Sequence, residues 1–110
     1  MIQYSLISEI PNIMTESVFK ALADPTRRHI LKLLKERSMT AGEIGEHFNL
    51  AKSTLSWHFN VLKAADLIVD ERHQTSITYS LNLTVVDETL SVLMDLLKVN
   101  HHSNPAKEQK

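Results

Sequence analysis

The sequence predicts a small, mainly α-helical domain that carries one β-hairpin. Apolar residues recur at helical spacing through most of the chain, and a strict alternation of apolar and polar residues comes just before the last helical stretch. A chain of 110 residues with 43% apolar residues can bury one modest core. We therefore expect one domain.

The first two helices are separated by an Asp-Pro pair. Helical spacing of apolar residues predicts a first helix over Glu16–Ala23. Asp24 is a favoured N-cap and Pro25 a favoured first helical residue, so this pair predicts the start of a second helix that runs to Arg37. Its inward-facing residues are Ile30, Leu31 and Leu34.

The third helix is short and begins at a capping box. Thr40 and Glu43 have the required spacing, so the Thr side chain can cap the helix while the Glu side chain reaches back. The helix carries Ile44 and Phe48. We expect Asn49 to end it in the left-handed conformation.

A fourth helix begins only a few residues later and runs to about Ala65. The turn before it holds Leu50, which we expect to be buried. The apolar stripe of the helix consists of Leu55, Phe59 and Leu62. A short helix, a tight turn and a longer helix with a polar outer face together indicate a helix-turn-helix.

A hairpin follows directly. Leu67–Val69 and Ser76–Leu81 are predicted strands, and the segment DERHQT between them is a polar tip. A hairpin that directly follows the second helix of a helix-turn-helix is called a wing. The predicted fold is therefore a winged helix-turn-helix, with four helices, two strands and a fifth helix in that order.

The fifth helix, over Val85–Val99, is apolar on more than one side. One stripe consists of Val86, Leu90, Leu93 and Leu97, and a second of Val85, Val92, Leu96 and Val99. One stripe serves the core of the protomer, and the other needs a second surface. A partner copy across a two-fold axis supplies one, so we expect a homodimer.

These elements define three segments. Residues 1–14 are an N-terminal extension, residues 15–99 form the winged domain with dimerising terminal helices, and residues 100–110 are a polar tail that we expect to be disordered.

The outer face of the fourth helix holds the only tryptophan of the chain. Trp57 lies opposite the apolar stripe, among small polar residues instead of the Glu, Lys and Gln that a solvated face usually carries. Two hypotheses explain it: the ring faces a DNA groove, or it folds back onto the third helix or a partner chain.

Composition excludes several classes of protein. The chain has no cysteine, so disulfides, thiolate metal sites and cysteine nucleophiles are excluded. Its start lacks the features of a signal peptide, and no apolar run reaches about 18 residues, so we expect a cytoplasmic protein without membrane insertion. A net charge of −1 argues against a nonspecific polycation, although residues 24–63 hold seven basic and four acidic residues.

Three stretches resemble the ArsR/SmtB family of bacterial winged-helix repressors. They are ALADPTRRHILKLL, TAGEIGEHFNLAKSTLSWHFNVLKAADLIVDER and TSITYSLN, and the resemblance covers Val18 to Leu97 without gaps. The chain looks most similar to the small members without metal ligands that repress their own operons. The resemblance implies operator binding by a homodimer formed through the first and last helices. The residues predicted for that interface are Val18, Phe19, Leu22, Leu90, Leu93, Met94 and Leu97.

The metal sites of the family are not matched. Thr40 stands where metal-sensing relatives have a ligand cysteine, and Asp87 and Asp95 have no histidine at the spacing of the site on the last helix. His101 and His102 come too late in the chain. We therefore expect no metal, no cofactor, and a repressor whose signal is another ligand, a protein partner or dilution.

The family pattern and the helical wheel together give the candidate DNA contacts. Small polar residues on an exposed helix allow close approach to bases and phosphates. The fourth helix would contribute Lys52, Ser53, Thr54, Ser56, Trp57 and Asn60, and the wing Arg72, His73 and Gln74. His58 matches a family histidine and is either a contact or a bonded structural residue.

An enzyme is not expected. With two glycines there is no phosphate loop, and no spacing of Ser, His and Asp implies a catalytic triad. The alternative function is a winged-helix protein-interaction module that has lost DNA binding, in which Trp57 would be a protein hot spot.

Overall fold

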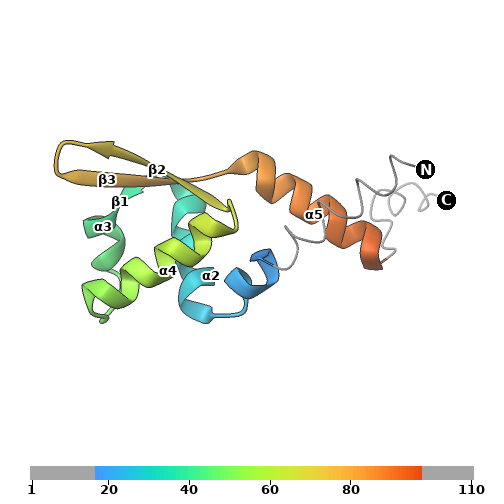
Figure 1. Ribbon diagram of the computed structural model, residues 1–110, viewed down its shortest axis with the longest axis horizontal. Helices are drawn as coiled ribbons and strands as arrows, with labels where there is room; N and C mark the ends of the chain where they lie inside the picture. The colour runs from blue at the N-terminus through green and yellow to red at the C-terminus, as the bar shows by residue number, and fades with distance from the viewer. Residues whose placement is uncertain (1–16, 98–110) are drawn as a thin grey trace.

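Helices and a small antiparallel sheet alternate along the chain in the computed structural model, which describes residues 17–97 (Figure 1). After helical residues 17–22, the elements are α2 (Pro25–Glu36), β1 (Met39–Thr40), α3 (Ala41–Gly45), α4 (Lys52–Ala64), β2 (Ile68–His73), β3 (Ser76–Leu81) and α5 (Leu83–Leu97). The predicted winged helix-turn-helix fold is confirmed. The extension 1–14, the tail 100–110 and the outer ends of the domain 15–99 lie outside the described residues.

The core is formed by the helices and the inner face of the sheet. All three residues of the apolar stripe predicted for α4 are buried in it. The buried apolar residues are Val18, Ala21, Ile30, Leu34, Met39, Ile44, Leu55, Phe59, Leu62, Ala65, Leu67, Ile68 and Tyr79. None of the helices in the part of the chain that the structure describes is long and apolar enough to cross a membrane.

The start of α2 is the predicted Asp-Pro cap. The Asp24 carboxylate accepts hydrogen bonds from the amides of Thr26 at 2.7 Å and Arg27 at 3.3 Å, and Pro25 is the first helical residue. Burial raises the pKa of Asp24, but the two amide hydrogen bonds and the nearby charge of Arg27 together lower it by more, so the net pKa lies below the usual range. The carboxylate is therefore charged at neutral pH, where it caps the helix best.

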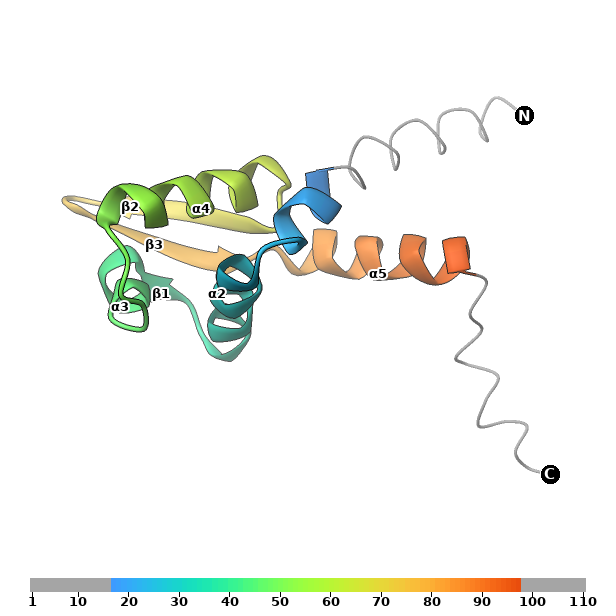
Figure 2. The ribbon, with the colours of Figure 1, turned by 90° about the horizontal axis from the view of Figure 1, so that it is seen from below.

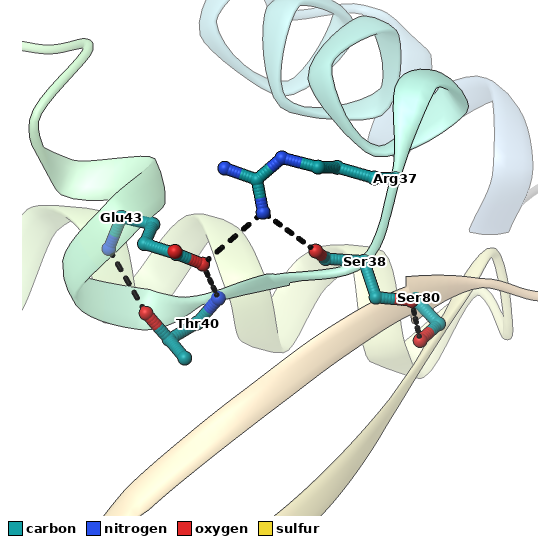
Figure 3. A network of polar contacts seen from close by, with 5 residues as sticks. All are labelled: Arg37, Ser38, Thr40, Glu43 and Ser80. Carbon is teal, nitrogen blue, oxygen red and sulfur yellow. Dashed lines mark hydrogen bonds and ion pairs between the residues drawn. The ribbon is translucent and has the colours of Figure 1, made fainter.

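The capping box of α3 is also confirmed (Figure 3). The amide of Glu43 donates to Thr40 Oγ1 at 3.1 Å, and the amide of Thr40 donates to Glu43 Oε1 at 2.8 Å. Arg37 lies 3.5 Å from the same carboxylate oxygen and donates to the carbonyl of Ser38. These contacts fix the end of α2 against the start of α3.

The connection between α3 and α4 differs from the prediction. α3 ends at Gly45, and residues 46–51 lead to α4 through a turn at Glu46 and His47. Asn49 is not in the left-handed conformation. Leu50 was predicted to be buried, but 39% of its surface is exposed. Because the helix ends earlier, the connection is longer and places Leu50 at the surface.

The wing is larger than predicted. β2 extends to His73, so most of the segment DERHQT is strand, and only Gln74 and Thr75 form the turn. Gln74 adopts a positive φ of 55°, a left-handed conformation that glycine adopts more readily than other residues. β3 pairs with β2 and also with β1, a two-residue strand that the sequence did not reveal.

α5 leaves the body of the domain and extends away from it (Figures 1 and 2). Val85 and Val86 pack against the core, but none of the residues of α5 is buried. The prediction that one apolar stripe of this helix serves the core of the protomer therefore holds only for its first turns. Leu90 and Leu97, which were predicted for the dimer interface, are exposed in the protomer. Val99 lies outside the described residues.

Candidate nucleic-acid interface

The outer face of α4 is a row of exposed, mostly small polar side chains. All six residues that the sequence proposed on this helix are exposed: Lys52, Ser53, Thr54, Ser56, Trp57 and Asn60. Ala51 is the N-cap, and no side chain caps the helix there. The first amides of α4 therefore remain available to an external acceptor, as at helix N-termini that bind phosphate.

The inner face of α4 is held rigidly against the sheet. The rings of Phe59 and Tyr79 stack with their centroids 4.4 Å apart. At the end of the helix, Lys63 Nζ lies 2.9 Å from the Asp70 carboxylate on β2. This hydrogen bond lowers the pKa of Asp70. Both contacts join α4 to the strands of the wing, β2 and β3.

The three wing residues that were predicted to contact DNA lie at the tip of the hairpin. Arg72 and His73 end β2 and Gln74 lies in the turn, and all three are exposed. The carboxylate of Glu71 is 3.3 Å from His73 Nε2. This carboxylate offsets part of the positive charge that Arg72 brings to the tip.

Trp57 points outward from α4, with 53% of its surface exposed. An arginine and a histidine lie against its covered part. The Arg27 guanidinium carbon lies 5.1 Å from the ring centroid, and the His58 ring lies edge-on with the centroids 5.0 Å apart. The indole is therefore exposed and yet held by neighbours from α2 and α4.

His58 is a structural residue of the fold. It is 5% exposed, and its Nδ1 lies 3.1 Å from Arg27 Nη1. Because arginine only donates hydrogen bonds, Nδ1 must accept, which places the imidazole proton on Nε2. Of the two roles left open for His58, the structure supports the bonded one.

Arg27 is the site residue that the sequence analysis missed. It is 5% exposed, although an arginine beside a second arginine suggests a solvated surface. A signal was present, because Arg27 has the same helical spacing as the buried Ile30 and Leu34.

The described residues 17–97 contain no group of three or more His, Cys, Asp or Glu side chains arranged to hold a metal ion. Thr40, which the resemblance places at a ligand position of metal-sensing relatives, caps α3.

Known proteins are similar to this chain over the helix-turn-helix and the elements that flank it. A Helix-turn-helix domain family matches residues 22–71. The transcriptional repressor SdpR of Bacillus subtilis is 49% identical over 81 residues, which cover 74% of this chain and 90% of that protein. The crystal structure of an ArsR family transcriptional regulator superposes with a TM-score of 0.66 at 26% identity, covering 79% of this chain and 99% of the other.

The chain belongs to the ArsR/SmtB family. An ArsR-like regulator from Rhodococcus superposes with a TM-score of 0.71 over 89% of this chain and 92% of that one, which supports the fold at 23% identity. The predicted resemblance is thus confirmed. In this ArsR/SmtB member, α3 and α4 are the helix-turn-helix, and β2 and β3 are the wing.

Proposed function

We propose that this ArsR/SmtB protein is a DNA-binding transcriptional repressor that binds a palindromic operator as a homodimer. The observation that carries the proposal is the outer face of α4, where small polar residues are exposed on a helix fixed from behind. The 49% identity to a protein named as a transcriptional repressor supports it. Operator DNA as the target implies a cytoplasmic location.

Each candidate residue has a role that suits its chemistry. Lys52 at the start of α4 pairs with a phosphate, and Ser53, Thr54 and Ser56 approach bases or phosphates closely. Asn60 has the side chain that pairs with an adenine edge. From the wing, Arg72, His73 and Gln74 reach the adjacent minor groove or backbone.

The homodimer is proposed from the apolar surface that the protomer leaves uncovered. Exposed leucines run along α5, and Phe19 on the first helical stretch is also exposed. We place Phe19, Leu22, Leu90, Leu93, Met94 and Leu97 in the interface. Val18 is fully buried in the protomer and has no surface left for a partner, so it is left out.

Trp57→Ala tests the DNA contact directly. Loss of a groove contact should weaken specific operator binding by about 1 to 3 kcal/mol. Thermal stability should change little, because half of the ring is already exposed. Operator fragments selected from the source genome would be titrated by fluorescence anisotropy, and melting would be followed by circular dichroism.

The same titration has a second readout in the unmodified protein. Operator DNA should quench or blue-shift the emission of Trp57, and unrelated DNA at moderate salt should do so weakly. A variant that melts early but binds the operator normally would show that Trp57 is a packing residue instead of a contact.

Repression is expected to be independent of metal. The chain lacks cysteine, and Asp87, Glu88 and Asp95 of α5 have no histidine at the family spacing. Operator affinity should survive exhaustive chelation, and Zn²⁺ should change it by no more than about threefold at neutral pH. Selecting bound DNA fragments with and without added metals shows whether operator binding depends on metal. A hundredfold loss on stoichiometric zinc would contradict the expectation and direct attention to His101 and His102.

A further inference from the structure

Arg27 is a buried cation whose hydrogen-bond partners are all neutral. Its Nε donates to the carbonyl of Ala21 at 2.8 Å, its Nη2 to the carbonyl of Lys20 at 2.9 Å, and its Nη1 to His58 Nδ1 at 3.1 Å. Within residues 17–97, no carboxylate forms an ion pair with this guanidinium. A buried charge is costly unless it is well bonded, so the three contacts hold Arg27 in one place.

The two carbonyls belong to the end of the helical residues 17–22. Carbonyls in the last turn of a helix lack partners within the helix, and a cation there also interacts favourably with the helix dipole. Arg27 therefore joins the end of this helical stretch to α2. The stretch carries Phe19, which we place in the dimer interface.

On its other side, Arg27 reaches the outer face of α4. Its guanidinium lies against the Trp57 ring, and it also bonds the imidazole that meets the same ring edge-on. A half-exposed indole without such contacts would change rotamer freely and lose that freedom on binding. Holding the ring in place before binding reduces this entropic cost.

We propose that Arg27 is a positioning residue for operator recognition, which holds Trp57 for DNA contact and couples it to the dimerising helical residues 17–22. This inference rests on the proposed function, since it requires Trp57 to touch DNA. In this proposal Arg27, which lies beneath the outer face of α4, contributes to the affinity for operator DNA without touching the DNA.

A double-mutant cycle tests the coupling. Arg27→Lys keeps the charge but loses the planar fork that reaches three acceptors. It should weaken operator binding about fivefold in the otherwise unmodified protein, and should have no further effect in a Trp57→Ala background. Equal losses in both backgrounds, or no loss in either, would overturn the proposal.

Arg28→Lys is the matched control. Arg28 also caps the first helical stretch, through a 2.7 Å hydrogen bond from Nη1 to the carbonyl of Leu22, but it is exposed. Its replacement should leave operator affinity unchanged within about twofold. A loss equal to that of Arg27→Lys would mean that capping the helical stretch, and not positioning Trp57, is what matters.

Fluorescence of the free protein separates this proposal from the proposed function. Arg27→Lys should add a fast component to the anisotropy decay of Trp57, because the ring gains rotational freedom. If Trp57→Ala leaves operator binding unchanged, the DNA contact is wrong, and the proposal of a role in recognition fails with it. The anisotropy decay still shows whether Arg27 restrains the ring. An unchanged decay in Arg27→Lys would overturn the positioning role even if Trp57 contacts DNA.

A pair of His58 variants serves if Arg27→Lys does not fold. His58→Asn offers an amide oxygen near the place of Nδ1, so Arg27 keeps an acceptor. His58→Leu removes the acceptor while keeping apolar volume. Operator affinity should fall about fivefold more in the leucine variant than in the asparagine variant. Equal affinities would contradict the proposal.

Discussion

Ser56→Glu on α4 is expected to abolish specific operator binding while leaving the protein folded. Ser56 is exposed in the middle of the row of small polar residues. A carboxylate there adds bulk where the helix approaches the groove and places a negative charge against phosphates. We expect a loss of about 3 kcal/mol or more, at least about a hundredfold in affinity. Fluorescence anisotropy with a labelled operator fragment measures it.

Ser91→Glu is the control for this substitution. Ser91 is also exposed and helical, but it lies on the polar side of α5 near Asp87 and Glu88. The change in net charge is the same, so any general repulsion from DNA appears in both variants. Melting temperatures of both should match that of the unmodified chain. If Ser56→Glu binds like Ser91→Glu, α4 does not enter the groove.

The face of α4 was predictable because helical periodicity is a local property. Leu55, Phe59 and Leu62 define the buried side, and the opposite side follows from geometry. The caps at Asp24 and Thr40 were equally accessible, since each depends on residues within three positions of one another. These signals placed α2, α3 and α4, and with them the face of α4 for which we propose DNA binding.

The features that the sequence did not reveal depend on distant parts of the chain. β1 has two residues and exists because Met39 and Thr40 pair with β3. The burial of Arg27 depends on His58, which is remote in sequence. Arg27 and His58 both lie in stretches that resemble the ArsR/SmtB family, but their contact requires α2 and α4 to pack together. A helical wheel for one element cannot show this.

α5 illustrates a different limit. Its surplus of apolar residues was visible, but periodicity alone did not show which stripe packs on the protomer. In the structure only Val85 and Val86 pack against the core, because the helix then leaves the domain. The apolar surface that the protomer leaves exposed is therefore wider than one stripe. Along α5 it includes the exposed Leu83, Leu90, Leu96 and Leu97.

A combined Leu90→Glu and Leu97→Glu variant is expected to be a folded monomer that no longer binds the operator tightly. The two leucines share one side of α5 and are 49% and 62% exposed in the protomer, so their replacement removes little from its core. In the proposed dimer, burying the exposed parts of these side chains in both protomers contributes about 3 to 6 kcal/mol, and unpaired carboxylates in their place would oppose association further. The dissociation constant of the dimer should rise at least about a thousandfold.

Sedimentation velocity at micromolar concentration measures this change, with circular dichroism to confirm the fold. Ser91→Glu, on the polar side of the same helix, should remain dimeric. Because a dimer binds two half-sites at once and a monomer only one, operator affinity should fall together with dimerisation. A monomeric unmodified chain at the same concentration would remove the proposed dimer. A Leu90 and Leu97 double variant that stays dimeric would place the interface elsewhere than on this side of α5.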